Sequence, residues 1–232
     1  MILLRPSSVN LMNKGFFCIL FLALFLAGSE PCLGEDISSL NLIGLRIGIW
    51  RMSSPEIVPQ IPEYQASAKT VSPYGEVFLS YGLKKGFSAE LSLGSCDRGE
   101  TRFEHGIDYY WESITIYPIS LGGYFYPLSH KPQTSWQPYL DLGISYVVGS
   151  RSLDYGSVYP GYRYFFEGYV KNSSAFGVFT GTGMDFNLSK YLILNFDFKY
   201  RWVKFGKEVG GIKDYSGAQI TLGFAYVLGI NR

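Results

Sequence analysis

From residue 35 onward, apolar and polar residues alternate one for one in eight separate runs. In the clearest run, which extends from Leu192 to Trp202, every second residue is large and apolar. The residues between them, from Asn195 to Arg201, are polar or charged. Because successive side chains of a strand point to opposite faces, this pattern predicts strands with one apolar and one polar face. The eight runs cover residues 42–51, 74–83, 86–96, 113–126, 138–149, 174–187, 190–204 and 217–229.

The connections between these runs alternate in length. They are short after the second, fourth and sixth runs, and long at 52–73, 97–112, 150–173 and 205–216. Short turns at one rim and long loops at the other are typical of an up-and-down antiparallel meander. The sequence therefore predicts an all-β fold, with one eight-stranded antiparallel barrel domain over residues 35–232.

The first 34 residues are predicted to be a cleaved signal peptide. Arg5 and Lys14 precede an apolar stretch from Gly15 to Gly28, which is shorter than the about 20 residues that a membrane-spanning helix needs. Small residues follow, so that cleavage is expected after Ser29 or Gly34. After cleavage at Gly34 one cysteine, Cys96, is left, and an internal disulfide is excluded.

The size of the apolar faces predicts how the barrel is oriented. Leu, Ile, Phe, Tyr and Trp occupy these faces almost throughout, and an eight-stranded interior is too narrow to hold them. We therefore expect the apolar faces to meet lipid, whereas the alternative of a soluble barrel would place them inside. Aromatic residues near the strand ends are expected to form the two interface girdles of a membrane barrel: Tyr74, Tyr81, Trp111, Tyr124, Phe125, Trp136, Tyr191, Trp202 and Tyr226.

The polar faces carry charged residues that this orientation places inside the barrel. Buried charges must be paired or hydrated, so we expect a salt-bridged polar core, with Glu76 near Lys199 and Arg201. Arg46 is expected at a lower level, nearer Glu90 and Asp141. The cluster is interpreted as a structural plug, and the alternative is an ion path or an acid–base site. Its members are Arg46, Glu76, Glu90, Asp141, Asp185, Asp197, Lys199 and Arg201.

The signal peptide, the eight strands and the uneven connections together resemble the small outer-membrane barrel proteins of the OmpA, OmpX and OmpW kind. Such barrels usually end in a motif that the insertion machinery reads: polar, any, Gly, any, any, aromatic, any, aromatic. Thr221, Gly223 and Tyr226 match this motif, and Leu228 replaces the final aromatic residue. The resemblance implies a location in the cell outer membrane, with membrane lipid and the barrel-insertion machinery as partners.

The loop over residues 150–173 is unusually aromatic. Its rings, interleaved with Gly, Arg and Glu, suggest a recognition surface for an extracellular ligand, because rigid aromatic side chains bind at a low cost in entropy. An equally open alternative is that the strands continue past the membrane and that these rings pack on one another. The candidate residues are Tyr155, Tyr159, Tyr162, Tyr164, Phe165, Phe166 and Tyr169.

Composition and motifs exclude several classes of function. The formal net charge is +1, and no basic excess points to nucleic acid. The two histidines, His105 and His130, are expected at opposite rims, where they cannot cooperate. We find no phosphate-binding glycine loop, zinc-ligand spacing or nucleophile motif. The sequence therefore predicts a protein that is not an enzyme and that uses no cofactor or metal.

The expected function is that of an outer-membrane barrel with a polar, plugged lumen and a structural or surface-interaction role through its long external loops. One alternative is an OmpW-like passage for small hydrophobic molecules, for which Trp50 or Phe78 would have to line an apolar pocket that opens sideways. Another is a lipid A-modifying enzyme that depends on His105.

Overall fold

A computed structural model describes residues 37–53, 64–66, 70–84, 86–105, 108–129, 135–159 and 162–230 of the chain. The predicted signal peptide, residues 1–34, lies outside the described residues.

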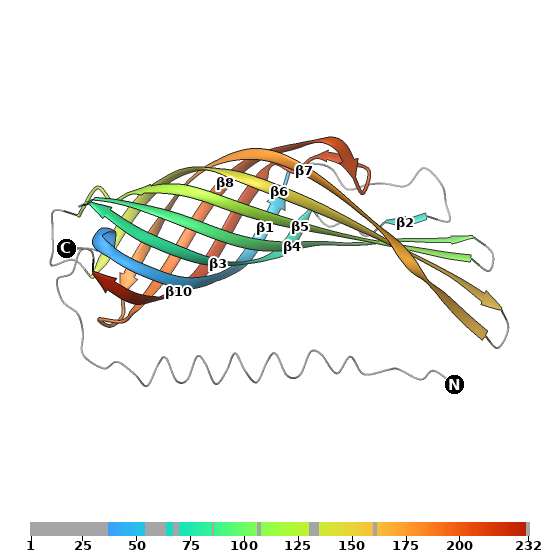
Figure 1. Ribbon diagram of the computed structural model, residues 1–232, viewed down its shortest axis with the longest axis horizontal. Coiled ribbons are helices and arrows are strands. Elements are labelled where there is room, and N and C mark those ends of the chain that lie inside the picture. Colours follow the sequence, from blue (N-terminus) through green and yellow to red (C-terminus); the bar gives the residue numbers. More distant parts are fainter. Residues whose placement is uncertain are drawn as a thin grey trace.

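Eight long antiparallel strands form a closed barrel in this part of the chain (Figure 1). Each strand pairs with the next along the chain, and the last pairs with both the first and β8, which closes the sheet. This confirms the predicted eight-stranded meander. The strands are β1 (Leu40–Met52), β3 (Val71–Lys84), β4 (Phe87–His105), β5 (Asp108–Phe125), β6 (Trp136–Tyr159), β7 (Tyr162–Asn187), β8 (Leu192–Val209) and β10 (Gly217–Ile230).

Along each strand, large apolar residues alternate with polar residues. The apolar residues lie on the outer surface of the barrel and the polar residues lie in its interior. In β8, Phe196, Phe198 and Trp202 are exposed on the outer wall, whereas Asp197 and Lys199 between them are buried. The same division recurs around the barrel, as in β1 with Ile47 outside. The predicted orientation, with the apolar faces on the outside, is therefore confirmed.

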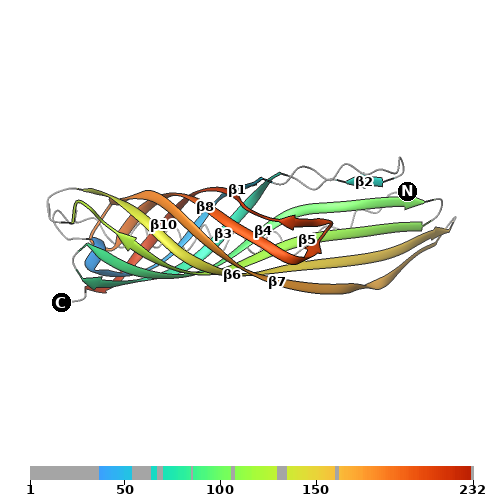
Figure 2. The ribbon, with the colours of Figure 1, turned by 90° about the horizontal axis from the view of Figure 1, so that it is seen from above.

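Four strands continue far beyond the barrel as one sheet, which we call the extension. Figures 1 and 2 show β4, β5, β6 and β7 projecting past the ends of the other long strands. The register pairs β4 with β5 as far as His105 and Asp108, and β6 with β7 as far as Tyr159 and Tyr162. The prediction of long loops at 97–112 and 150–173 is therefore wrong, because the described residues of these segments, 97–105, 108–112, 150–159 and 162–173, belong to paired strands. A short strand, β2 (Tyr64–Ala66), pairs with the outer part of β4.

A bulge marks the point at which β4 leaves the barrel. The register between β4 and β5 shifts at Asp97 to Gly99, and Gly99 has a φ of 104°, a left-handed conformation that favours glycine. Before the bulge, the even-numbered residues of β4, such as Cys96, lie on the inner face of the sheet. After it, the odd-numbered positions from Gly99 onward continue that face.

Two apolar clusters occupy the two ends of the barrel interior. The cluster at the extension end contains Trp50, Tyr74 and Ile116, together with Val209 and Tyr215 from the hairpin around β9 (Ile212–Asp214). The cluster at the short-turn end contains residues such as Leu42, Phe78 and Ile193. In the described residues, the 3-10 turn η1 (Ile37–Ser39) adds Ile37 to this second cluster, and no helix is long and apolar enough to cross a membrane.

Two of the predicted girdle aromatics are in the interior. Tyr74 and Tyr124 are both 3% exposed, because each lies at an inward position of its strand. Placing them in a lipid-facing girdle was therefore wrong. On the outer wall, Tyr81, Phe125, Trp136, Tyr191 and Trp202 are exposed and Tyr226 is partly exposed, whereas the side chain of Trp111 lies outside the described residues.

Candidate functional site

The interior between the two apolar clusters is a polar layer, built by inward-facing residues of all eight long strands. The eight charged residues that the sequence placed inside are all buried, each at most 5% exposed. Arg46 comes from β1, Glu76 from β3 and Glu90 from β4. Asp141 comes from β6, Asp185 from β7, and the other three from β8: Asp197, Lys199 and Arg201. The closure of the barrel thus brings residues 155 positions apart in sequence into one layer.

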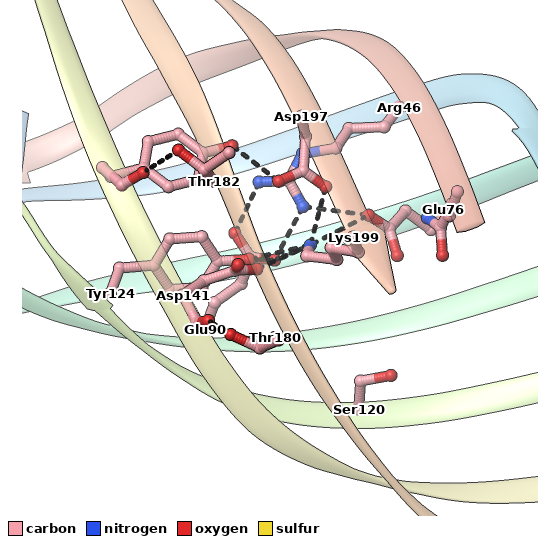
Figure 3. A network of polar contacts seen from close by, with 12 residues as sticks. Arg46, Glu76, Glu90, Ser120, Tyr124, Asp141, Thr180, Thr182, Asp197 and Lys199 are labelled. Carbon is pink, nitrogen blue, oxygen red and sulfur yellow. Dashed lines mark hydrogen bonds and ion pairs between the residues drawn. The ribbon is translucent and has the colours of Figure 1, made fainter. Parts of the chain in front are cut away.

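Arg46 lies between two carboxylates of the neighbouring strands. Its two terminal nitrogens bind Glu90 in a bidentate pair, at 2.7 Å each, and Nη1 also lies 2.9 Å from Glu76 Oε1 (Figure 3). Its Nε donates to the side-chain oxygen of Asn195, and the guanidinium carbon lies 3.8 Å from the ring centre of Phe78. Arg46 therefore contacts Glu90 most closely, as expected, and also contacts Glu76, which was expected at another level.

Lys199 lies among four carboxylates of the layer. Its Nζ lies 3.0 Å from Asp197 Oδ2 and 3.6 Å from Asp141 Oδ2. The same nitrogen is 3.9 Å from Glu76 and 4.0 Å from Glu90, so that one ammonium joins both halves of the layer (Figure 3).

Arg201 borders the layer on its extension side. Its Nη1 donates to the hydroxyls of Ser120 and Ser145, at 2.7 Å each, and its Nε donates to Gln219 Oε1 at 2.8 Å. Nη2 lies 3.8 Å from Glu76. The structure thus places Glu76 within 4 Å of Lys199 and Arg201.

Four tyrosines that the sequence analysis did not assign to this layer complete it. Each donates its hydroxyl to a different carboxylate: Tyr74 to Glu76, Tyr124 to Glu90, Tyr126 to Asp185 and Tyr139 to Asp197. The distances are 2.7 Å for the first two and 2.9 Å for the others. The spacing of Tyr74 to Glu76, and of Tyr139 to Asp141, could have indicated these residues, because positions two apart share a face.

The layer carries more acid than base. The five carboxylates and three cations give 3 − 5 = −2 if all eight are ionised. Neither oxygen of Asp141 has a hydrogen-bond partner among the described residues. A small cavity beside Arg46, Glu90 and Asp185 has a volume of about 10 Å³. This is close to the smallest space that holds one water molecule, and the surrounding groups could bind one.

The two residues considered for a sideways passage are both buried. Trp50 packs edge-on against Tyr74, with ring centres 6.0 Å apart, and Phe78 packs under Arg46. A trough of about 710 Å³ does exist on the outer wall, beside Ile47, Ile49 and Pro73. Tyr74 lines this trough while being buried in the apolar cluster at the extension end, so packed side chains stand between the trough and the polar layer.

Close packing of the wall is visible at Gly143 in β6. A Cβ atom there would lie 2.3 Å from the Leu121 carbonyl oxygen and 2.4 Å from the Phe179 ring. In contrast, a Cβ atom on Gly206 in β8 would have no neighbour within 4 Å.

The predicted insertion signal lies on β10. Thr221 and Gly223 face the interior, where a Cβ atom on Gly223 would meet the Arg46 side chain. Tyr226 faces outward and stacks on Tyr191 with ring centres 5.9 Å apart, and Leu228 is exposed.

The predicted recognition residues lie on the outer parts of β6 and β7, and their side chains lie outside the described residues. The register pairs Tyr155 with Phe166 and Tyr159 with Tyr162. It pairs Tyr164, Phe165 and Tyr169 with Ser157, Gly156 and Leu153. His105 ends β4, the surroundings of His130 are not described, and the described residues contain no cluster suited to a metal ion.

Known proteins resemble this chain in fold rather than in sequence. No protein-family model and no curated protein sequence matches it. The outer membrane protein OprG from Pseudomonas aeruginosa is 14% identical with a TM-score of 0.50, over 84% of this chain and 98% of OprG. A major outer membrane protein from Thermus thermophilus is 12% identical with a TM-score of 0.50, over 81% and 99% of the two chains. Neisserial surface protein A is 12% identical with a TM-score of 0.48, over 81% and 96%.

Together with the closed strand order, the likenesses to OprG and to the Thermus thermophilus protein show that the chain has the fold of small eight-stranded outer-membrane barrels, as the sequence predicted.

Proposed function

We propose that this chain is an outer-membrane protein whose barrel is a sealed support and whose function resides in the extension, at the cell surface. The observation that supports the proposal is the close packing of the described interior residues. A charge-paired layer lies between two apolar clusters, and a cavity lined by Arg46, Glu90 and Asp185 has a volume of only about 10 Å³. A passage for ions or small molecules needs a continuous space, which the contacts of Arg46 and Lys199 occupy.

The outer wall supports the membrane location. An apolar belt surrounds the barrel, with residues such as Ile47, Leu91, Leu142 and Phe196 exposed, and exposing this much apolar surface to water would be costly. In a bilayer the same residues meet acyl chains. The barrel-insertion machinery is the partner that would assemble it, through Thr221 to Leu228 on β10.

The extension supports the surface role, because it is larger than a mechanical support requires. β6 and β7 are 24 and 26 residues long, whereas a membrane-spanning strand needs about 9–11 residues. The surplus projects from one end of the barrel (Figure 1). With the short turns on the periplasmic side, the extension reaches into the medium.

Two measurements test this proposal. Protein refolded into planar bilayers is expected to give no discrete conductance steps, whereas an open porin in the same membranes gives them. An epitope inserted between residues 106 and 107 is expected to bind antibody on intact cells. The matched control is an epitope after Lys190, at the opposite end, which is expected to bind only after lysis. Stable conductance, or labelling of the Lys190 insertion on intact cells, would contradict the proposal.

A further inference from the structure

A row of aromatic residues crosses the four strands of the extension and the short strand β2 that pairs with β4. Four pairings in the register follow one another without a gap, from β2 through β4, β5 and β6 to β7. Residues at directly opposed register positions belong to the same face of a sheet. With strands about 4.8 Å apart, five positions span about 19 Å. The row consists of Tyr64, Phe103, Tyr110, Tyr155 and Phe166.

This face continues the inner face of the barrel. Ile116 and Ile114 of β5 are buried in the apolar cluster at the extension end. Counting in twos along β5 from Ile114 leads to Glu112, Tyr110 and Asp108, and the pairing of β5 with β6 has no register shift over this range. The aromatic row therefore occupies positions of the face that continues the inner face of the barrel wall.

The neighbouring positions on this face carry hydrogen-bonding groups. On the barrel side of the row, Thr101 pairs with Glu112. On the other side, His105 pairs with Asp108, which pairs with Ser157. At the paired positions of these three rows there is no Lys or Arg.

We propose that this face binds a neutral oligosaccharide. The inference rests on the proposed function, in which the extension is the working part of the protein. Aromatic rings pack against the apolar faces of sugar rings, while hydroxyl, carboxylate and imidazole groups bond to sugar hydroxyls. At the row itself, Glu112 and Asp108 disfavour phosphate, sulfate and nucleic acid, which bind where Lys and Arg gather. The cations at positions of this face, Arg151 and Lys171, oppose each other in the register one row nearer the barrel than Glu112. The length of the row suits a chain of several sugar units.

The test uses the full-length protein, folded in detergent, with maltohexaose, cellohexaose and chitohexaose as neutral probes and a heparin hexasaccharide as the anionic probe. We expect at least one neutral probe to bind, with an affinity that changes little between about 50 and about 500 mM NaCl. Binding of heparin alone, or of none of the four probes, would overturn the inference.

A pair of matched variants tests the face. Tyr110→Ala with Tyr155→Ala removes two members of the row and is expected to weaken binding roughly tenfold or more. Tyr109→Ala is the control, because Tyr109 pairs with Glu104 and Gly156 and so lies on the opposite face. It is expected to change the affinity by less than about twofold. Equal losses in the two variants would overturn the inference.

Two further readouts separate the possible failures. Both variants are expected to keep the mobility shift on boiling that marks a folded barrel, and a row variant that lost it would be replaced by Tyr110→Ser alone. The antibody labelling of intact cells tests the proposed function independently. If antibody labels the extension on intact cells but no neutral probe binds, the sugar site is refuted and the proposed function is retained.

Discussion

Replacing Arg46 with methionine tests whether the polar layer stabilises the barrel. Methionine is of similar length and apolar, so that the substitution removes the charge and leaves most of the volume. The change deletes the bidentate pair with Glu90 and the 2.9 Å contact with Glu76, and leaves both carboxylates buried. Removing one partner of a buried pair costs about 3–5 kcal/mol.

The surroundings place the expected loss in the lower part of that range. Glu76 keeps Lys199, Arg201 and its bond from Tyr74, so it remains compensated. Glu90 keeps a bond from Tyr124 and the ammonium of Lys199 4.0 Å away, and loses its closest cation. We therefore expect Arg46→Met to lower the free energy of unfolding by about 3 kcal/mol.

The assay is equilibrium unfolding in urea, in lipid vesicles, followed by tryptophan fluorescence and by the mobility shift on boiling. The control is Lys204→Met, which breaks an ion pair of 3.7 Å to Asp214 on the exposed hairpin. Partial burial raises the pKa of Asp214, but hydrogen bonds with Ser216 and the charge of Lys204 hold it below its usual value, so this pair is ionised. Because both side chains are largely exposed, the expected loss is at most about 1 kcal/mol.

A double variant identifies the cause of the loss. In Arg46→Met with Glu90→Gln, the uncompensated carboxylate is gone, and we expect recovery of about half of the lost stability. If Arg46→Met costs no more than Lys204→Met, or if the double variant is less stable than the sum of its parts, the layer is not held by charge pairing and the reasoning fails.

Three further outcomes are expected. Gly143→Ala should lower the free energy of unfolding by about 1–3 kcal/mol, whereas Gly206→Ala should change it by less than about 0.5 kcal/mol, measured by the same urea titration. In variants that retain a single tryptophan, brominated lipid should quench Trp202 strongly and Trp50 hardly at all, and equal quenching would contradict the orientation of the wall. Leu228→Phe completes the terminal motif and should speed assembly in reconstituted insertion assays, which an unchanged or slower rate would refute.

The alternation of residues was sufficient to predict the barrel and its orientation. Lipid outside and a narrow interior impose opposite chemistry on neighbouring residues, so the period of two is strong in a run such as Leu192 to Trp202. The same period placed the charged residues inside. It could not give their partners, because the contact of Arg46 with both Glu76 and Glu90 depends on how the strands are staggered around the barrel.

Tyrosine and the outer strands were harder to predict for specific reasons. A tyrosine suits a membrane interface and a polar interior equally well, so Tyr74 and Tyr124 were assigned by their nearness to strand ends rather than by position parity. Residues 150–157 are rich in Gly, Ser and Asp, which disfavour strands in isolation. There the long pairing with β5 and β7 overrides local preference, and only the fold reveals that pairing.

The participation of every long strand in the polar layer has a consequence for biogenesis. A partly formed sheet that lacks β1 would leave Glu90 without Arg46, its closest cation, and Glu76 without its 2.9 Å contact, while its apolar outer face already favours the bilayer. Stepwise insertion, strand by strand, would therefore pass through states with bare charges in hydrocarbon. The pairing of β1 with β10, which closes the barrel, must therefore form before or during transfer into lipid. Entry into the membrane is then a single cooperative event.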